Sequence, residues 1–282
     1  MNNLQKCQLN ILKEFIRVCE ENSLIYFLIG GSCLGAVRHQ GFIPWDDDID
    51  VAMPRVDYDK FITLQNKVKE PYFIQTYKTD KRYIYNYAKM RDSSTTYIEN
   101  YFTYHRINHG VWIDIFPLDG MSRKDNVPIK RFSKKVRLNW FNAYLMYLPA
   151  LLRKPQLKTL WKDIPLNLVA ILFLFLNVGH YRNKMIDRRV TKISYNDALL
   201  VGNFFGSNPT KEAMPKEVFK EGIVMKFEGI DVKVPSDYDK YLTLLYGDYM
   251  KLPPKEKQVG HHHNSGLDLN VDYKTFVKWH KI

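Results

Sequence analysis

The 282-residue sequence predicts an α/β (α+β) protein in which helices flank a sheet core. Amphipathic stretches with helical spacing alternate with short apolar runs, the pattern expected when helices cover a sheet. The apolar run 25–29 leads directly into Gly30-Gly31-Ser32, which reads as a strand followed by a turn that opens a helix. Hydrophobic residues make up 45% of the chain, which is ample for a core.

The first 120 residues show the clearest periodicity. Leu4, Cys7, Ile11 and Phe15 fall on one helical stripe with charged residues opposite, and this stripe predicts a buried helix face. The following segments are assigned from their apolar period in the same way. The expected elements are a helix over 4–20, strands over 25–29 and 48–53, helices over 32–39 and 55–69, and strands over 72–77, 83–91 and 111–116.

The later part of the chain predicts helices over 164–178 and 181–193, then a strand over 199–205. A hairpin over 224–234 is expected to turn at Glu228-Gly229, and Ser236 is expected to N-cap a helix ending at Tyr246-Gly247. We expect three regions: a catalytic core at 1–120, a helical basic and apolar insertion at 121–195, and a C-terminal completion of the core at 196–282.

Two carboxylates dominate the chemistry of the second strand. Residues i and i+2 of a strand face the same side, so Asp48 and Asp50 are expected to project together, about 6–7 Å apart at the backbone. Like charges held this close repel unless a cation lies between them, and Mg²⁺ prefers such oxygen ligands. Asp46 has the same parity but follows Pro44-Trp45, and the sequence leaves open whether Asp46 and Asp47 support the site or are solvated.

The turn Gly30-Gly31-Ser32 supplies what a phosphate needs, namely a closely approaching backbone, N–H groups at a helix start and a hydroxyl. The alternative is an ordinary turn. Arg38, at the end of the short helix, either reaches a phosphate or caps the helix. His39 is expected to be a structural hydrogen-bonding residue.

In the segment 83–91, every second residue is aromatic or basic. In a strand these residues would lie on one face of the sheet. Lys89 and Arg91 are candidates to clamp phosphates. The tyrosines Tyr83, Tyr85 and Tyr87 either contact a base or a quaternary ammonium, or pack on a helix.

Asp114 lies in the middle of the apolar run 111–116, where a charge is costly unless it is paired or binds a cation. It is therefore the natural third carboxylate beside Asp48 and Asp50. Asp119, before Gly120, fits a turn residue equally well.

The net charge of +12 and the pI of about 9.4 favour anionic partners, such as a nucleotide, a phosphate polymer, nucleic acid or an anionic membrane. Three cysteines are too few and wrongly spaced for a disulfide framework or a zinc site, and the N-terminus lacks a signal-peptide apolar core, so we expect a reducing, cytosolic location. Residues 121–180 combine Lys and Arg with an apolar run of about 15 residues, too short to span a bilayer. This segment predicts either a buried helix or a helix lying on anionic lipid.

Six stretches form a longer pattern: Gly30-Gly31-Ser32, 34–39, 41–50, 114–119, 246–249 and Pro253-Pro254. Together they resemble the LicD family of phosphocholine transferases. The resemblance covers most of residues 1–120 and returns at about 220–263, whereas 121–200 matches no motif.

The resemblance implies a nucleotidyltransferase-like fold, a mixed sheet whose Gly-Gly/Ser turn and three carboxylates hold Mg²⁺. It implies Asp48 and Asp50 as metal ligands and Asp114 as a further ligand or a base, with Gly31 and Ser32 in the phosphate-holding turn. LicD-type enzymes move phosphocholine from CDP-choline onto a sugar of a cell-surface glycan, such as teichoic acid or lipopolysaccharide. Family members also move other phospho-groups, so the head group stays open.

We therefore expect an in-line displacement in which Lys89, Arg91 and Arg38 stabilise the departing CMP. A lipid-linked glycan acceptor would explain the basic apolar segment and predicts a cytoplasmic protein, peripheral at the inner face of the plasma membrane. The alternatives are transfer from another CDP-linked donor, nucleotidyl transfer to a small acceptor, and nucleic-acid binding. The last is disfavoured because the sequence contains no recognised nucleic-acid module. The run 261–263, three histidines, is expected to be a solvated loop.

Overall fold

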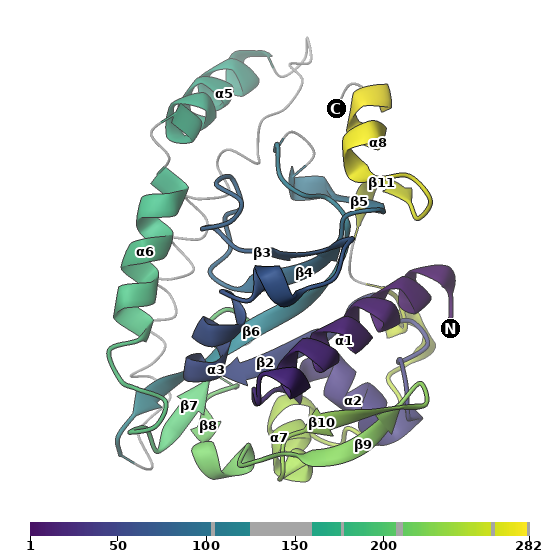
Figure 1. Cartoon of the computed structure of the whole chain (residues 1–282), viewed down its shortest axis with the longest axis vertical. Coiled ribbons are helices and arrows are strands. Elements are labelled where there is room, and N and C mark those ends of the chain that lie inside the picture. Colours follow the sequence, from purple (N-terminus) through teal and green to yellow (C-terminus); the bar gives the residue numbers. More distant parts are fainter. Residues whose placement is uncertain (103–104, 125–159, 176–177, 207–210, 261–262, 281–282) are drawn as a thin grey trace.

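The computed structural model describes residues 1–102, 105–124, 160–175, 178–206, 211–260 and 263–280 (Figure 1). At its centre is a seven-stranded mixed sheet, with helices packed around it, as the sequence predicts. The main path runs, in spatial order, through β1 (Phe27–Leu28), β2 (Asp50–Pro54), β6 (Val111–Ser122), β4 (Ala88–Asp92) and β3 (Tyr72–Gln75). The far end of β6 also pairs with β7 (Leu200–Gly202), which pairs with β8 (Met214–Pro215).

The register of the sheet determines where the acidic residues lie. Strands β2 and β6 are parallel and place Asp50 opposite Asp114. Strand β4 runs antiparallel on the other side of β6 and places Lys89 opposite the same Asp114. Directly opposed residues on neighbouring strands share a face of the sheet. One face therefore presents Asp50, Asp114 and Lys89 in a row across three strands.

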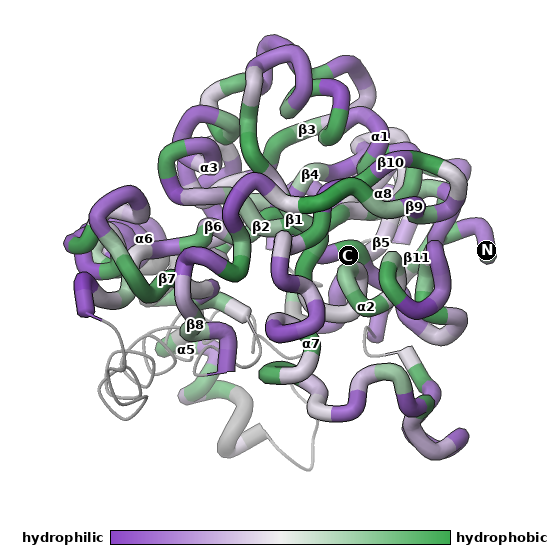
Figure 2. Tube along the Cα trace, turned by 90° about the horizontal axis from the view of Figure 1, so that it is seen from below, coloured by the Kyte–Doolittle hydropathy of each residue, from purple (hydrophilic) through white to green (hydrophobic). Residues whose placement is uncertain are grey.

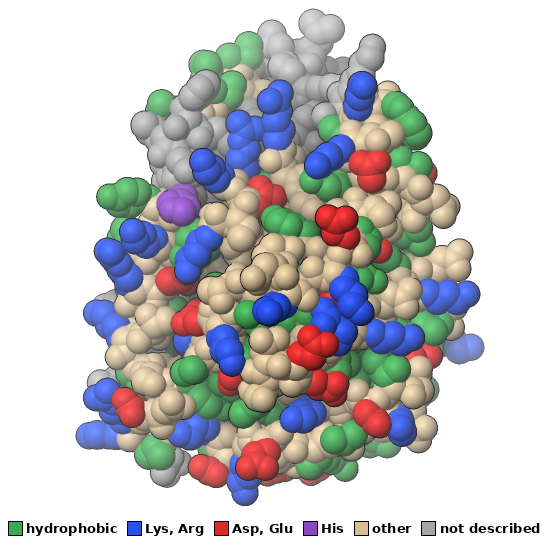
Figure 3. All heavy atoms as spheres, viewed as in Figure 1, with side chains coloured by type: hydrophobic (Ala, Val, Ile, Leu, Met, Phe, Trp, Pro, Cys, Tyr) green, Lys and Arg blue, Asp and Glu red, His purple; other side chains and the backbone are tan. Residues whose placement is uncertain are grey.

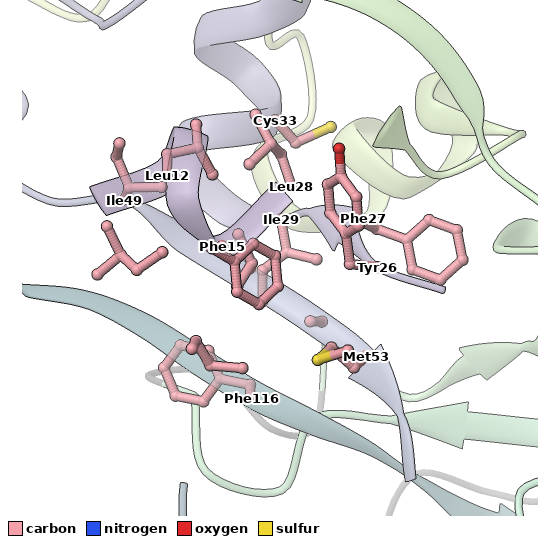
Figure 4. Packing of buried hydrophobic residues seen from close by; sticks show 14 of the residues in the cluster. Leu12, Phe15, Tyr26, Phe27, Leu28, Ile29, Cys33, Ile49, Met53 and Phe116 are labelled. Atoms are coloured by element: carbon pink, nitrogen blue, oxygen red, sulfur yellow. The ribbon is translucent and has the colours of Figure 1, made fainter. Parts of the chain in front are cut away.

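Helix α1 (Asn3–Glu21) covers the sheet with its apolar stripe and contacts β6 and β4. Its N-terminus is a capping box, in which the Asn2 side chain accepts from the Gln5 backbone N–H and the Gln5 side chain accepts from Asn2. Phe15 packs edge-on against Tyr26 and Phe61. Side chains from α1, β1 and β2 meet in one apolar layer (Figure 4), and hydrophobic residues are prominent on the central strands (Figure 2).

A second group of elements closes the lower part of the molecule in Figure 1. Helix α2 (Gly30–His39) contacts α7 (Tyr238–Tyr246) and the hairpin of β9 (Ile223–Phe227) and β10 (Ile230–Val234). The expected hairpin is confirmed. The predicted N-cap is wrong by one residue, because Asp237 accepts from the Lys240 backbone N–H, while the Ser236 hydroxyl bonds the 219–222 turn instead.

Helix α6 (Val178–Val190) attaches to the core through polar contacts and carries α5 (Leu160–Phe175) beyond it. Asn86 donates to the Asn183 carbonyl and to Asp187, and Tyr77 donates to Asp187. Among the described residues, no helix is both long and apolar enough to cross a membrane. Most of the basic run after Lys124 and the apolar stretch 140–152 lie outside the described residues.

The remaining elements lie at the edges. Strand β5 (Thr96–Glu99) pairs antiparallel with β11 (Asn264–Asp268), near the C-terminal helix α8 (Tyr273–His280). Helix α3 (Arg55–Phe61) follows β2 and contacts β6. Single turns of 3₁₀ helix occur at Gln65–Lys67, Asn100–Phe102, Lys216–Val218 and Lys255–Lys257.

Three expectations about local structure were wrong. The strand predicted from Tyr83 begins only at Ala88, and the helix predicted over 55–69 ends at Phe61. Asp119 is no turn residue: it is fully buried within β6, where both its carboxylate oxygens accept from Arg55 at 2.7 Å. Such a bidentate pair allows a buried strand to contain a carboxylate, because the guanidinium and the carboxylate neutralise each other's charge.

Candidate active site

A cavity of about 530 Å³ opens where α2, β2, β6 and α7 meet. One side of it, which we call the N-terminal wall, comes from the loop and strand ends around α2. Its polar members are Gly30, Gly31, Asp46, Asp48 and Asp50. Asp114 of β6 and the aromatic residues Trp45, Tyr87 and Phe116 complete this side. The cavity therefore joins the turn and all three carboxylates that the sequence selected.

The carboxylates crowd one another. Burial raises the pKa of Asp50 well above its usual value, and the nearby charges of Asp48 and Asp114 raise it further. Burial and then the charge of Asp48 raise the pKa of Asp46 to about 8. Asp46 therefore belongs to the site, a question that the sequence left open. Asp48 precedes β2 rather than lying within it, so the loop, and not strand parity, brings Asp48 to the cavity.

The turn is held by hydrogen bonds to neighbouring elements. The Gly30 N–H donates to the Tyr241 hydroxyl at 3.0 Å, and the Asp50 N–H donates to the Ser32 hydroxyl at 2.9 Å. Ser32 is buried and thus ties β2 to α2, while Gly30 and Gly31 line the cavity. Gly30 has φ of +54°, and a Cβ on Gly31 would lie 2.6 Å from an oxygen of Asp46. The two glycines are required by conformation and by close approach, respectively.

Lys89 has the predicted parity but a different environment. Its ammonium lies 3.3 Å from Asp114 and 3.0 Å from Glu99, and 3.9 Å from the centre of the Trp112 ring. Its side chain is almost fully buried. Lys89 is absent from the described residues that line the cavity. The structure therefore places Lys89 behind Asp114, and not on the phosphate side as expected.

Arg91 is also turned away from the cavity. It is fully buried and donates to Glu99, to Gln75 and to the Gly110 carbonyl. Burial alone would raise the pKa of Glu99, but Lys89 and Arg91 lower it to about 2. A row of alternating charges thus runs from Arg91 through Glu99 and Lys89 to Asp114. The expectation that Arg91 holds a phosphate conflicts with this geometry, because the guanidinium is already bonded inside the protein.

Arg38 and His39 contact each other rather than the carboxylates. Arg38 donates through Nε to His39 Nε2 at 3.0 Å and through Nη1 to the Tyr249 carbonyl at 2.6 Å. Burial, and then the charge of Arg38, lower the pKa of His39. These bonds link the end of α2 to the segment after α7, and they show neither of the two roles expected for Arg38, a phosphate contact or a helix cap.

The three tyrosines have different surroundings. Tyr87 lines the cavity and packs against Phe116 with ring centres 4.4 Å apart. Tyr85 stacks on Tyr87 at 4.8 Å. Tyr83 is fully buried in a separate apolar cluster with Phe102. The alternation expected for a strand does not apply before Ala88, and Tyr87 is the one of the three that lines the cavity in the described structure.

A further group of lining residues, which we call the C-terminal wall, was not assigned to the site from the sequence. Its members are Asn203, Phe205, Glu212, Tyr241 and Tyr246. Tyr241 and Tyr246 lie in α7, and the stretch 246–249 was part of the family resemblance but received no role in the site. No motif marks the other three. His263 is exposed, and His261 and His262 lie outside the described residues.

Comparison with known proteins supports the assignment that the site suggests. A family profile described as "LicD/FKTN/FKRP, nucleotidyltransferase domain" matches residues 23–146. The lipopolysaccharide cholinephosphotransferase LicD of Haemophilus influenzae is 33% identical over 260 residues, covering 90% of this chain and 92% of the relative. The chain belongs to the LicD family. An uncharacterized protein of Rickettsia prowazekii is 28% identical over 116 residues, which is 34% of this chain and 42% of the relative.

The residues at the N-terminal wall of this LicD-family chain fit a divalent cation. Carboxylate oxygens of Asp46, Asp47 and Asp48, one from each residue, lie within 4.8 Å of one another. Asp50 and Asp114 line the same cavity, and the pKa values of Asp46 and Asp50 are raised, as expected for carboxylates that lack a counter-charge. An all-oxygen donor set of this kind suits Mg²⁺.

Proposed function

We propose that this protein transfers phosphocholine from a CDP-linked donor, CDP-choline, to a sugar hydroxyl of a cell-surface glycan. The observation that carries the proposal is the single cavity that combines a carboxylate cluster with the Gly-rich start of α2. The family membership supports it, since the Haemophilus relative is a lipopolysaccharide cholinephosphotransferase by name. Lipopolysaccharide is therefore the first acceptor to test, with teichoic acid as the second.

Mg²⁺ would be held by Asp48 and Asp50, with Asp114 and Asp46 as further oxygen ligands. When bound, the ion neutralises charge on the diphosphate of the donor. The N-terminus of α2 directs backbone N–H groups and the positive end of its dipole toward the phosphates. The ion pair with Lys89 restricts the orientation of the Asp114 carboxylate at the cavity. These groups position the donor for in-line displacement.

Tyr87 is the residue we assign to the choline head group. Its ring lines the cavity, and the stacked Tyr85 and the adjacent Phe116 restrict its motion. A quaternary ammonium over such a ring gains about 0.5–2 kcal/mol. Tyr87→Leu should raise KM for CDP-choline about tenfold while leaving KM unchanged for an analogue in which an uncharged tert-butyl group replaces the ammonium. Equal losses with both donors would contradict the assignment.

The direct test incubates the purified protein with Mg²⁺, lipopolysaccharide that carries no phosphocholine, and a panel of CDP-linked donors. We expect CMP release with CDP-choline and a phosphocholine mass increment on the glycan. CMP release with CDP-ethanolamine or CDP-ribitol alone would reassign the head group. A nucleotide mass on the acceptor would establish nucleotidyl transfer, and no product with any donor would refute the proposal. Asp231→Asn, an exposed change on β10, serves as the matched control for Asp→Asn variants.

We further propose that α5 and α6 bring the protein to an anionic membrane surface, where a lipid-linked acceptor would be found. Helix α5 exposes Trp161, Ile164, Leu168 and Leu172, an unusual amount of apolar surface for one helix. The neighbouring α6 is basic, and Lys and Arg side chains line its edge of the molecule (Figure 3). Apolar insertion combined with basic flanks is the chemistry of an interfacial helix.

Flotation with vesicles tests this partner. The protein should float with vesicles containing phosphatidylglycerol at low salt, and not with purely zwitterionic vesicles. Leu168→Glu combined with Leu172→Glu should abolish flotation and leave CMP release with a water-soluble acceptor unchanged. Exposed Leu252, far from α5 in the sequence, provides the control substitution Leu252→Glu. Wild-type protein that stays at the bottom of the gradient with every vesicle composition would contradict membrane binding.

A further inference from the structure

The C-terminal wall contains a carboxylate with no counterpart in the sequence motifs. Glu212 lies just before β8 and is nine-tenths buried, yet it lines the same cavity as Asp50 and Asp114. A Cβ on Gly206 would lie 2.3 Å from Glu212 Oε1 and 2.8 Å from Asn203 Nδ2. The lack of a side chain at 206 therefore leaves the space that the Glu212 carboxylate occupies.

The charge of Glu212 acts on the interior of the cavity. After burial and the closer carboxylates, Glu212 adds to the rise in the pKa of Asp50. It also adds to the rise in the pKa of Tyr246, whose hydroxyl is near Gly30. Glu212 nonetheless stands apart from the cation cluster: in the described part of the chain, the three-carboxylate group within 4.8 Å comprises Asp46, Asp47 and Asp48. Glu212 thus lines the same cavity as the proposed cation ligands without belonging to that three-carboxylate group.

Asp114, the base suggested by the family resemblance, is poorly suited to accept a proton. Lys89 lies 3.3 Å from it, and this ammonium is buried and held by Glu99 as well. The Asp114 carboxylate is thus already engaged by a buried ammonium, and the proposed cation would engage it from the cavity. Asp46, Asp48 and Asp50 are committed to the cation. Of the carboxylates that line the cavity in the described structure, this leaves Glu212 for proton transfer.

We propose that Glu212 is the general base that takes the proton from the acceptor hydroxyl, an inference that rests on the proposed transfer reaction. The hydroxyl oxygen attacks the phosphorus of the phosphocholine group and a new O–P bond forms. The bond from that phosphorus to the bridging diphosphate oxygen breaks, and its electron pair leaves with CMP. The hydroxyl proton passes to Glu212 and then to solvent. The acceptor therefore enters along the C-terminal wall.

Glu212→Gln tests this role with little change in shape. We expect kcat to fall at least about 100-fold with lipopolysaccharide as acceptor, the usual contribution of a positioned base. KM for CDP-choline and the affinity for Mn²⁺, measured by calorimetry, should stay within about threefold of the wild type, since the cation cluster is intact. Glu217→Gln, an exposed change five residues away, is the control and should behave as the wild type.

Chemical rescue separates a base from a structural residue. Formate added to Glu212→Ala should restore CMP release in proportion to its concentration, and should have no effect on the wild type. Normal turnover in Glu212→Gln, loss of Mn²⁺ affinity, or a change confined to KM would each overturn the proposal. Failure of formate to rescue a folded Glu212→Ala would also overturn it. If the wild type itself releases no CMP with any donor, the transfer reaction is refuted, and the base assignment with it.

Discussion

The two walls of the cavity differ in how the chain builds them. Most polar residues of the N-terminal wall come from the stretch 30–50, and with Asp114 they concentrate negative charge that a cation would relieve. The C-terminal wall collects single residues from a strand end, a loop and α7, and carries one carboxylate among aromatic and amide groups. The family profile covers residues 23–146 and hence the first wall alone, whereas the similarity to the Haemophilus LicD extends over most of the chain. The acidic lining is thus encoded largely within one stretch of sequence, whereas the C-terminal wall depends on the tertiary fold.

The largest expected effect breaks the N-terminal wall. Asp50→Asn removes a cation ligand, and we expect kcat/KM to fall about a thousandfold, which corresponds to about 4 kcal/mol of transition-state stabilisation. The same variant should unfold at a higher temperature than the wild type in EDTA, because it removes one of several repelling charges. In the C-terminal wall, Tyr246→Phe should cost less than about tenfold. Comparable losses from both variants, measured by CMP release, would erase the distinction between the walls.

The next effect concerns the support behind Asp114. Lys89→Met leaves the buried Asp114 and Glu99 without their shared cation, and we expect a loss of about 3 kcal/mol, or about 10 °C in Tm. Lys81→Met, at an exposed position, should leave the free energy of unfolding and Tm unchanged. Thermal unfolding of the two variants measures the difference. A stable Lys89→Met protein with a raised KM for the donor would instead return Lys89 to the phosphate role expected from the sequence.

The pH dependence of stability follows from the N-terminal wall. The pKa of Asp46 is raised to about 8 and that of Asp50 is raised as well, so the folded protein binds more protons than the unfolded chain between about pH 4 and pH 8. Stability of the protein in EDTA should therefore fall as pH rises through this window, by about 10 °C in Tm from pH 5 to pH 8. Millimolar Mg²⁺ should remove the slope. A flat profile in EDTA would show that the carboxylates do not crowd one another.

The smallest effect tests the close approach of the turn to the cluster. Gly31→Ala places a methyl group 2.6 Å from an oxygen of Asp46, which must shift. We expect about a tenfold loss in kcat/KM, about 1.4 kcal/mol, with no change in Tm beyond about 2 °C. Gly229→Ala, where nothing lies within 4 Å of the added atom, strains only an exposed turn and should leave activity unchanged. Full activity in Gly31→Ala would mean that Asp46 does not need its present position.

The sequence predicted the N-terminal wall well because its chemistry is local. Asp114 was selected because the cost of a charge within an apolar run was a sufficient signal, and the parallel pairing of β2 and β6 brings it beside Asp50. Asp48 and Asp50 were selected together from the two-residue period of a strand. That reason was partly wrong for Asp48, since the strand begins two residues later than expected and the loop positions Asp48.

The same reasoning failed where a distant segment decides the environment. The two-residue period of a strand correctly placed Lys89 on the same face as Asp114. It could not reveal that Glu99 forms ion pairs with both Lys89 and Arg91. Glu212 has ordinary neighbours in sequence, and Tyr246 lies in a stretch of the family resemblance that received no role in the site. Both become functional candidates only because the fold brings α7 and the residues before β8 to the same cavity as β2. No periodicity argument could have found them.

The pairing of β6 with β7 has a further consequence. Ser122 and Leu200 are direct partners across these two strands, so the chain departs from the sheet and returns to it at adjacent points. The described helix α6 lies between these partners in the sequence and packs on the core through Ile186 and Val190. A change in the length of the chain between Ser122 and Leu200 therefore need not shift the register of either strand, provided that α6 keeps this packing.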